Sequence, residues 1–154
     1  MLRMPVALKC MRTREGDVAL QAFKRELVLG SCASLGSHES IARMLDAFVD
    51  GLMLVVVWEL VQGPDLLDLL NEAHGVMPER AACFYFRQLL CAVDALHECG
   101  FCHRDIKPEN CMVSRSSHRL KLIDFGLSKH LGSARTLGVG TADYMAPENS
   151  ARQT

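Results

Sequence analysis

The segment at residues 101–110, FCHRDIKPEN, constrains the fold and the chemistry of this chain more than any other stretch. Three of its side chains suit work on a phosphate group. Asp105 can accept a proton, and Lys107 places a compact positive charge two residues later. Asn110 offers a neutral oxygen ligand for a metal ion. The rest of the chain can be organised around this segment.

Two short strands are predicted directly after it, at residues 111–113 and 119–123, on either side of a polar turn. They would hold Asn110 close to Asp124, the carboxylate that opens the tripeptide DFG. Mg²⁺ prefers oxygen ligands and takes only one or two of them from protein, with phosphates and water completing its shell. Phosphoryl transfer needs such positioning and charge neutralisation more than covalent chemistry. The pattern therefore predicts a site for a metal-bound phosphate.

Composition and charge favour one soluble globular domain. Of the 154 residues, 49% are hydrophobic and 23% are charged, which is ordinary for such a domain. The formal net charge of -1 indicates no strong attraction to nucleic acid or membrane. The longest apolar run, at residues 52–58, is far shorter than a membrane span, and no N-terminal signal is visible. We expect a cytoplasmic protein, with the nucleus as the alternative, and no nucleic-acid or membrane partner.

The seven cysteines are an odd number and are scattered through segments that read as core. Free thiols in a reducing compartment fit this pattern better than a disulfide framework. Residues 99–103, CGFCH, match the spacing of a thioredoxin-type motif and of a haem attachment site. His103 is better explained as the start of HRD at residues 103–105, so we expect neither function.

Hydrophobic periodicity and turn signals predict the other elements. In chain order they are a strand at 4–11, a helix at 18–29, a loop at 30–40, strands at 41–48 and 52–60, a short helix at 66–73 and a long helix from 78 to about 99. Asp65 is expected to cap the short helix, and Gly100 to stop the long one. The long helix is expected to bury one apolar face, made of Ala82, Phe86, Leu89, Leu90, Val93 and Leu96.

Six motifs stand in order along the chain: VALK at 6–9, FKREL at 23–27, VWELV at 57–61, HRD at 103–105, DFG at 124–126 and APE at 146–148. With these motifs the chain resembles the eukaryotic protein kinase family over nearly its whole length. Lys107 and Thr141 resemble the serine/threonine type. The stretches DFGLSK and GTADYMAPE look most like the calcium/calmodulin-dependent and AMP-activated branch, including its plant and algal relatives.

The resemblance implies an α+β, bilobal, protein-kinase-like fold that is incomplete in this chain. The small lobe would run from its third strand onward, and the large lobe only to the end of the activation segment. Residues 1–61 would be a partial small lobe with the hinge, and residues 62–154 a partial large lobe. The implied function is ATP-dependent transfer of a phosphoryl group to a protein serine or threonine hydroxyl, with ATP and Mg²⁺ as cofactors. The regulatory partner is left open.

The family implies roles in phosphoryl transfer for five of the residues above. Asp105 would orient and deprotonate the substrate hydroxyl, and Lys107 would neutralise the transferring group. Asn110 and Asp124 would bind Mg²⁺. Lys9 would hold the α- and β-phosphates.

The other implied roles concern nucleotide binding. Glu26 would be the ion-pair partner of Lys9. Ala7 and Met112 would sandwich the adenine, Glu59 and Val61 would lend backbone groups to its edge, and Asp65 could reach the ribose.

Several departures from the family pattern favour an alternative, a catalytically inactive kinase-like fragment or binding module. Only eight residues precede Lys9, so no glycine-rich loop is present, and an isolated chain is expected to be marginally stable. Trp58 fills the gatekeeper position, and Gly30 stands where a large apolar residue is usual. Leu137 stands at the usual phosphoacceptor position, with Thr136 one residue away.

Overall fold

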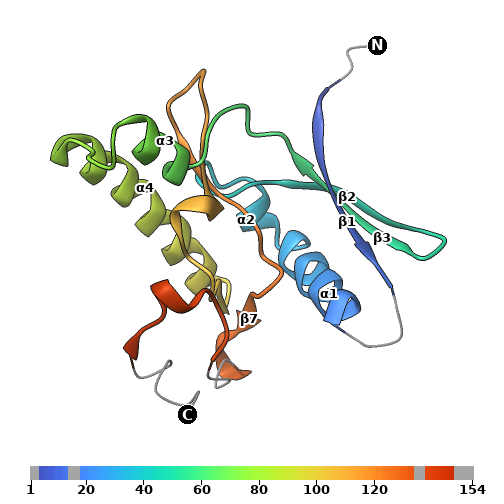
Figure 1. The fold of residues 1–154 in the computed structure, drawn as a ribbon. Coiled ribbons are helices and arrows are strands. Elements are labelled where there is room, and N and C mark those ends of the chain that lie inside the picture. The colour runs from blue at the N-terminus through green and yellow to red at the C-terminus, as the bar shows by residue number, and fades with distance from the viewer. Residues whose placement is uncertain (1–3, 14–17, 134–137, 148–154) are drawn as a thin grey trace.

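The computed structural model describes residues 4–13, 18–133 and 138–147. A three-stranded antiparallel sheet with the order β1-β3-β2 forms the small lobe (Figure 1). Its strands are β1 (Val6–Arg12), β2 (Met44–Asp50) and β3 (Met53–Glu59). The central strand β3 is the apolar run of the sequence, because a central strand that packs on both faces favours β-branched residues.

Helix α1 (Val18–Gly30) packs against this sheet. Its buried residues, Phe23, Glu26 and Leu29, recur every three positions and therefore share one face of the helix. The predicted loop at 30–40 is wrong in one detail, since it contains the short helix α2 (Ala33–Gly36). Leu35, which is 2% exposed, anchors that turn in the core.

The strand predicted at 41–48 begins later than expected, at Met44. Ile41 instead forms an isolated parallel bridge with Leu122, whose N–H donates to the carbonyl oxygen of Ser40. This pairing is non-local, so the hydrophobic pattern of the segment could not reveal it. It joins the small lobe to the large lobe.

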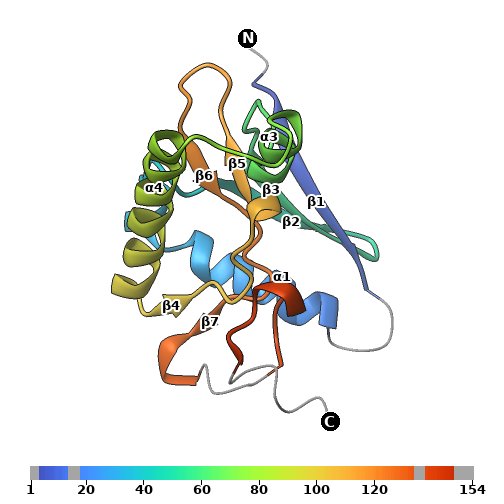
Figure 2. The same cartoon turned by 60° about the vertical axis from the view of Figure 1, so that its left-hand side comes forward.

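The large lobe contains helices α3 (Leu66–Glu72) and α4 (Glu79–Glu98) with two small antiparallel sheets (Figure 2). One sheet pairs β5 (Cys111–Val113) with β6 (Leu120–Leu122), and the other pairs β4 (Phe101–Cys102) with β7 (Lys129–His130). Three short 3-10 helices complete this part, η1 (Pro108–Asn110), η2 (Leu131–Ser133) and η3 (Ala142–Tyr144).

The apolar face predicted for α4 is partly wrong. The helix packs on β4 and β6, and the residues at 85, 89, 92 and 96 lie in or against the core, of which Ala92 and Leu96 are fully buried. Phe86 and Leu90, which were expected in the core, are 59% and 50% exposed. The apolar positions cover more of the helix circumference than the two strands contact, and tertiary packing selects the side that is buried.

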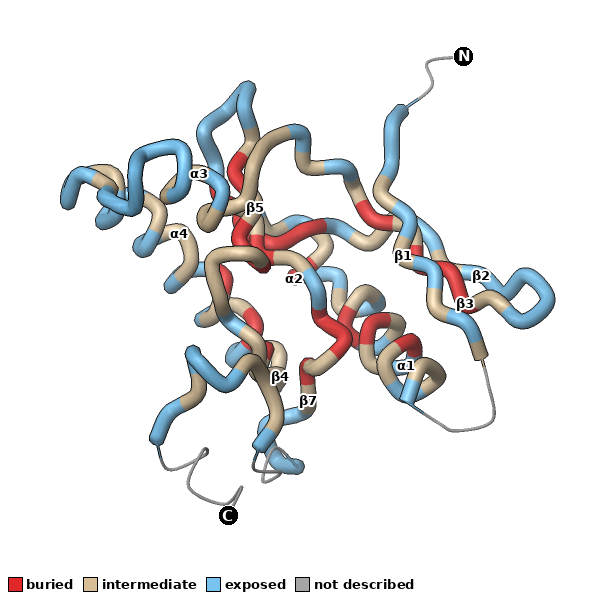
Figure 3. The backbone as a smooth tube through the Cα atoms, viewed as in Figure 1, coloured by how far each residue is buried: buried red, intermediate tan, exposed pale blue. Residues whose placement is uncertain are grey.

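The core lies where the sheet, α1 and the β5–β6 hairpin meet (Figure 3). Phe125 is fully buried there, with its ring centroid 5.5 Å from that of Trp58 and 5.2 Å from that of His103. The structure thus has the predicted α+β architecture. Within the described part of the chain, no helix combines the length and the apolar character that crossing a membrane requires.

Candidate active site

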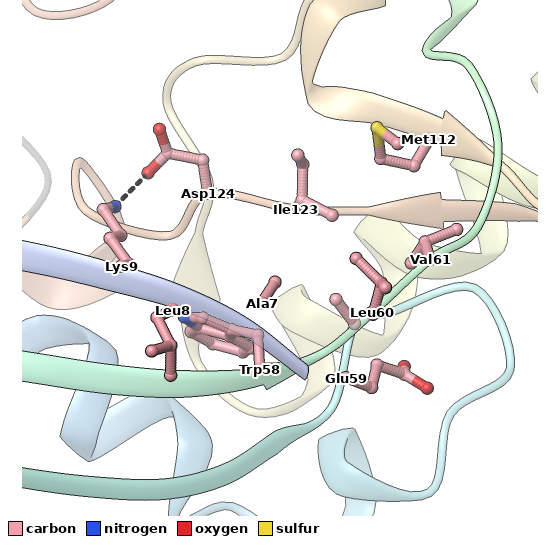
Figure 4. A pocket seen from close by; sticks show the side chains of 11 residues that line it. Ala7, Leu8, Lys9, Trp58, Glu59, Leu60, Val61, Met112, Ile123 and Asp124 are labelled. Carbon is pink, nitrogen blue, oxygen red and sulfur yellow. Dashed lines mark hydrogen bonds and ion pairs between the residues drawn. The ribbon is translucent and has the colours of Figure 1, made fainter. Parts of the chain in front are cut away.

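Lys9 on β1 links the sheet to α1 and to the large lobe. Its Nζ forms an ion pair with Glu26. It also donates a hydrogen bond to Oδ1 of Asp124 over 2.6 Å, drawn as the dashed line in Figure 4. Glu26 is completely buried, whereas the Asp124 side chain is 48% exposed. Residues from three separate segments therefore meet at one ammonium group.

The three charged groups shift one another's pKa values. Burial lowers the pKa of Lys9, but the hydrogen bonds from Lys9 to Asp124 and Glu26 outweigh it and raise the pKa overall. Burial raises the pKa of Glu26, and the lysine compensates only in part. Burial would also raise the pKa of Asp124, but the hydrogen bond and the charge of Lys9 dominate and lower it. At neutral pH, Lys9 is a cation and Asp124 an anion.

The predicted β5–β6 hairpin is present, and it pairs the backbone of Asn110 with that of Ile123, the residue before Asp124. Cys111 pairs with Leu122, and the N–H of Ile123 donates to the carbonyl oxygen of Asn110 over 2.9 Å. The backbone at Asp124 has a φ of 58°, in the left-handed region that costs a residue of this type about 1 kcal/mol or more. Such local strain is common where a side chain is aimed at a ligand.

A second cluster surrounds Asp105. Its Oδ1 accepts hydrogen bonds from the backbone N–H (2.9 Å) and the hydroxyl (2.7 Å) of Thr141. Its Oδ2 accepts from Nδ2 of Asn110 (3.1 Å) and lies 3.2 Å from Nζ of Lys107. Lys107 also donates to the Thr141 hydroxyl over 2.8 Å. Burial raises the pKa of Asp105, but these contacts outweigh it and lower the pKa overall.

Contacts made by His103 and Arg104 hold the loop that carries Asp105 in place. Nε2 of His103 lies 2.9 Å from the carbonyl oxygen of Ile123, and Nε of Arg104 donates to the carbonyl oxygen of Leu127 over 2.7 Å. Burial lowers the pKa of His103, so the ring is neutral at pH 7. Arg104 has a φ of 68°, which these contacts maintain.

A mainly apolar cavity of about 380 Å³ opens beside Lys9 and Asp124 (Figure 4). Its size lies within the range of small-molecule sites. Four residues that the sequence predicted around a nucleobase line it: Ala7, Glu59, Val61 and Met112. The other lining residues are Leu8, Lys9, Ala42, Trp58, Leu60, Ile123 and Asp124.

Asp65 does not line this cavity. Its Oδ1 accepts a hydrogen bond from the N–H of Asp68 over 2.8 Å and caps α3, as the sequence predicted for its local role. The Glu59 side chain also points to protein groups, since it pairs with Lys121 and accepts from the N–H of Arg43. A ligand in the cavity would therefore meet the backbone of Glu59.

Trp58 and Gly30, the two unusual core residues, are accommodated by direct packing. Trp58 is 9% exposed and lies between the cavity and Phe125. A Cβ atom at Gly30 would lie 2.4 Å from the sulfur of Met44. Met44 therefore fills the space that a larger residue at position 30 would need.

Thr141 is a site residue that the sequence does not identify. In the sequence it indicates only the serine/threonine type, whereas in the structure its hydroxyl contacts both Asp105 and Lys107. The signal available in the sequence was a hydroxyl in the stretch GTADYM. Sequence alone could not show that this hydroxyl contacts Asp105, which lies 36 positions earlier in the chain. Thr136, Leu137 and Glu148 lie outside the described residues.

Oxygen donors for a cation are present but sparse. No group of three or more His, Cys, Asp or Glu residues that could hold a metal occurs within the described ranges. Asn110 and Asp124 alone would leave most of the coordination shell of Mg²⁺ to phosphates and water, which is how this ion is usually bound. The donor set therefore fits a metal that arrives with a phosphate ligand.

Comparisons with known proteins agree with this geometry. The family described as "Protein kinase domain" matches residues 3–153. Citron rho-interacting kinase from Rattus norvegicus is 42% identical over 111 residues, which cover 70% of this chain and 5% of the relative. Myotonin-protein kinase from Homo sapiens is 35% identical over 139 residues, which cover 88% of this chain and 21% of the relative.

A probable myosin light chain kinase from Dictyostelium discoideum is 34% identical over 149 residues. That alignment covers 93% of this chain and 37% of the relative. The chain thus spans only a small part of the length of each of these relatives.

Proposed function

Because this chain belongs to the protein kinase family, we propose that it transfers the γ-phosphoryl group of Mg-ATP to a serine or threonine hydroxyl of a protein substrate. The observations that carry the proposal are two charged clusters, of which the first lines the cavity and the second is linked to it through the backbone hydrogen bond from Ile123 to Asn110. One cluster joins Lys9 to Glu26 and Asp124. The other joins Asp105 to Lys107 and Asn110.

Asp105 is the group proposed to receive the substrate hydroxyl. Its lowered pKa keeps it ionised at neutral pH, so it can orient the hydroxyl and accept its proton. Lys107 contacts the same carboxylate and would supply positive charge to the phosphoryl group during its transfer. Thr141 holds Asp105 and Lys107 together, so a substrate hydroxyl would meet a preorganised acceptor.

The nucleotide is proposed to enter the 380 Å³ cavity with its base against Ala7 and Met112. Lys9, kept cationic by its two carboxylate partners, would bind the phosphates at the inner end. Asn110 and Asp124 are the residues that would hold Mg²⁺, which when bound neutralises charge on the phosphate oxygens. Because Asp124 also accepts a hydrogen bond from Lys9, it would orient the lysine and the metal together.

The finer predictions remain proposals. The serine/threonine type rests on Lys107 and Thr141, whose side chains are in contact. The relatives named above do not single out the calcium/calmodulin-dependent and AMP-activated branch. A cytoplasmic location, with the nucleus as the alternative, and the division into lobes at 1–61 and 62–154 also stay predictions.

A second candidate function is a non-catalytic binding module. The observation in its favour is the set of large apolar side chains that α4 exposes, Phe84, Phe86 and Leu90, each at least 50% exposed. Such a group suits contact with another protein surface. Binding of a nucleotide without phosphate transfer would favour this function.

The experiment is transfer of labelled phosphate from ATP to a serine peptide and to a tyrosine peptide, with Mg²⁺ present. We expect transfer to the serine peptide by the natural chain, loss of transfer in Asp124→Ala, and retention in Asp94→Ala. Asp94 is an exposed carboxylate on α4, outside both clusters, and serves as the matched control. Equal transfer by the natural chain and by Asp124→Ala would sink the assignment.

A further inference from the structure

Two cysteines that are distant in sequence lie side by side at helix ends. The sulfur of Cys32 is 3.2 Å from the sulfur of Cys99. Cys32 follows the end of α1, and its backbone N–H donates to the carbonyl oxygen of Leu29 over 3.0 Å. Cys99 follows the end of α4, and its N–H donates to the carbonyl oxygen of Ala95 over 3.2 Å. Both cysteines are therefore positioned by hydrogen-bonded helical turns.

A serine hydroxyl bridges the two thiols. Oγ of Ser34 lies 3.3 Å from the sulfur of Cys32 and 3.1 Å from that of Cys99. The hydrogen bond with Ser34 makes the largest contribution to lowering the pKa of Cys32, and the hydrogen bond with Cys99 makes the next largest. The hydrogen bond with Ser34 also lowers the pKa of Cys99, but desolvation and the neighbouring Cys32 outweigh it and raise the pKa overall. The pair thus has one thiol that ionises more readily than an ordinary cysteine and one that ionises less readily.

Two other cysteines, Cys102 and Cys111, are arranged differently. The CxxC spacing suggests Cys102 as the partner of Cys99. The thiol of Cys102 instead donates a hydrogen bond to the carbonyl oxygen of Lys129 over 3.3 Å. Cys111 is 1% exposed, and burial raises the pKa of its thiol to about 12. Cys32 and Cys99 are both partly exposed, so a small reagent in solvent can reach them.

We propose that Cys32 and Cys99 are a redox modification site, at which a peroxide forms a reversible disulfide between the end of α1 and the end of α4. The Cys32 thiolate attacks one peroxide oxygen, an S–O bond forms, the O–O bond breaks, and the leaving hydroxide takes a proton to become water. The Cys99 sulfur then attacks the sulfur of the Cys32 sulfenic acid. The S–S bond forms as the S–O bond breaks, and the thiol proton leaves with the second water. The two thiols lose two electrons to the peroxide.

The geometry requires little movement. A disulfide S–S bond is about 2.05 Å long, so the two sulfurs must approach by about 1 Å. The bond would fix the end of the helix that carries Glu26 against the end of α4, which leads directly into the segment that carries Asp105. It would therefore limit the movement of α1 relative to the large lobe. The proposal rests on the thiols alone and does not depend on phosphate transfer.

The test uses the full 154-residue chain in hydrogen peroxide, followed by alkylation, digestion without reductant and mass spectrometry. We expect a linked peptide pair that contains Cys32 and Cys99, has lost two hydrogen atoms and is released by dithiothreitol. The melting temperature of the oxidised chain should rise by roughly 5 to 15 °C, because the bond closes a long loop. Hydrogen exchange along α1 should slow in the same sample.

Variants separate this pairing from random oxidation. Ser34→Ala should slow the formation of the link several-fold, whereas Cys83→Ser, which removes an exposed thiol on α4, should leave its rate unchanged. A link from Cys99 to Cys102 would overturn the proposal, as would oxidation of Cys32 to a sulfinic acid without any link. An equal yield of the Cys32–Cys99 link in concentrated urea would also overturn it, because the folded geometry would then be irrelevant.

Discussion

Replacing Thr141 with valine removes one hydroxyl from the centre of the candidate site and keeps the β-branched shape of the side chain. In the structure this hydroxyl donates to Oδ1 of Asp105 over 2.7 Å and accepts from Nζ of Lys107 over 2.8 Å. The backbone N–H of Thr141 donates to the same Asp105 oxygen over 2.9 Å, and valine retains that bond. The variant therefore loses only the two side-chain hydrogen bonds.

The size of the effect follows from the charges involved. Lys107 keeps its contact with Asp105 at 3.2 Å, so the main loss is the hydrogen bond from the hydroxyl to the carboxylate. Hydrogen bonds to charged groups contribute about 1.5 to 3 kcal/mol. Lost in full from the transition state, this bond corresponds to a fall of about 10- to 150-fold in kcat/KM. Burial raises the pKa of Asp105, and this hydrogen bond is the largest contribution that lowers it, so the pKa should rise in the variant.

Two measurements check the prediction. The first is kcat/KM for phosphate transfer from ATP to a serine peptide. The second is an NMR titration of the Asp105 carboxyl group, which requires no turnover. Thr141→Ser, which keeps the hydroxyl, is the matched control and should stay near the natural chain in both. Equal losses in the serine and valine variants would contradict the prediction, because keeping the hydroxyl would then not preserve activity.

Three further perturbations have defined outcomes. Glu26→Gln should lower kcat/KM by roughly tenfold through loss of one ion pair with the lysine of β1, while Mg²⁺ dependence stays unchanged in a titration of the metal. Because the pKa values of Asp105 and Asp124 are lowered in the folded state, their stabilisation is present above the unfolded value and is lost as the pH falls below about 4. Thermal melts across that range should show a shallower loss in Asp124→Asn, and an unchanged slope would contradict this. Gly63→Ala should lower the stability by about 1 to 3 kcal/mol, because its Cβ would lie 1.8 Å from the last carbonyl oxygen of β5, whereas a melt of Gly36→Ala should show little change.

The β5–β6 hairpin is a part of the fold that could be predicted from local sequence. Apolar residues on both sides of a polar turn predicted two short strands, and the pairing of Cys111 with Leu122 confirms them. The same reasoning predicted α1, α3 and the capping role of Asp65, because helix periodicity and capping depend on neighbours in sequence.

The face of α4 shows where local sequence was insufficient. Periodicity indicated an amphipathic helix but could not choose between adjacent apolar stripes. Strands β4 and β6 pack on the helix, and in the folded chain Ala92 and Leu96 are buried whereas Phe86 is exposed. The start of β2 was misplaced for a similar reason, because Ile41 pairs with Leu122, far away in the sequence.

The residue types of the candidate site could be predicted from the amino-acid sequence. Acidic, basic and amide side chains in motifs such as HRD and DFG suit phosphate chemistry, and their order along the chain indicated the family. Their contacts with one another became known from the folded structure. It joined Lys9 to Asp124 as well as Glu26, and it brought Thr141 to Asp105. Contacts of this kind depend on the distance between folded segments, and spacing along the chain does not determine that distance.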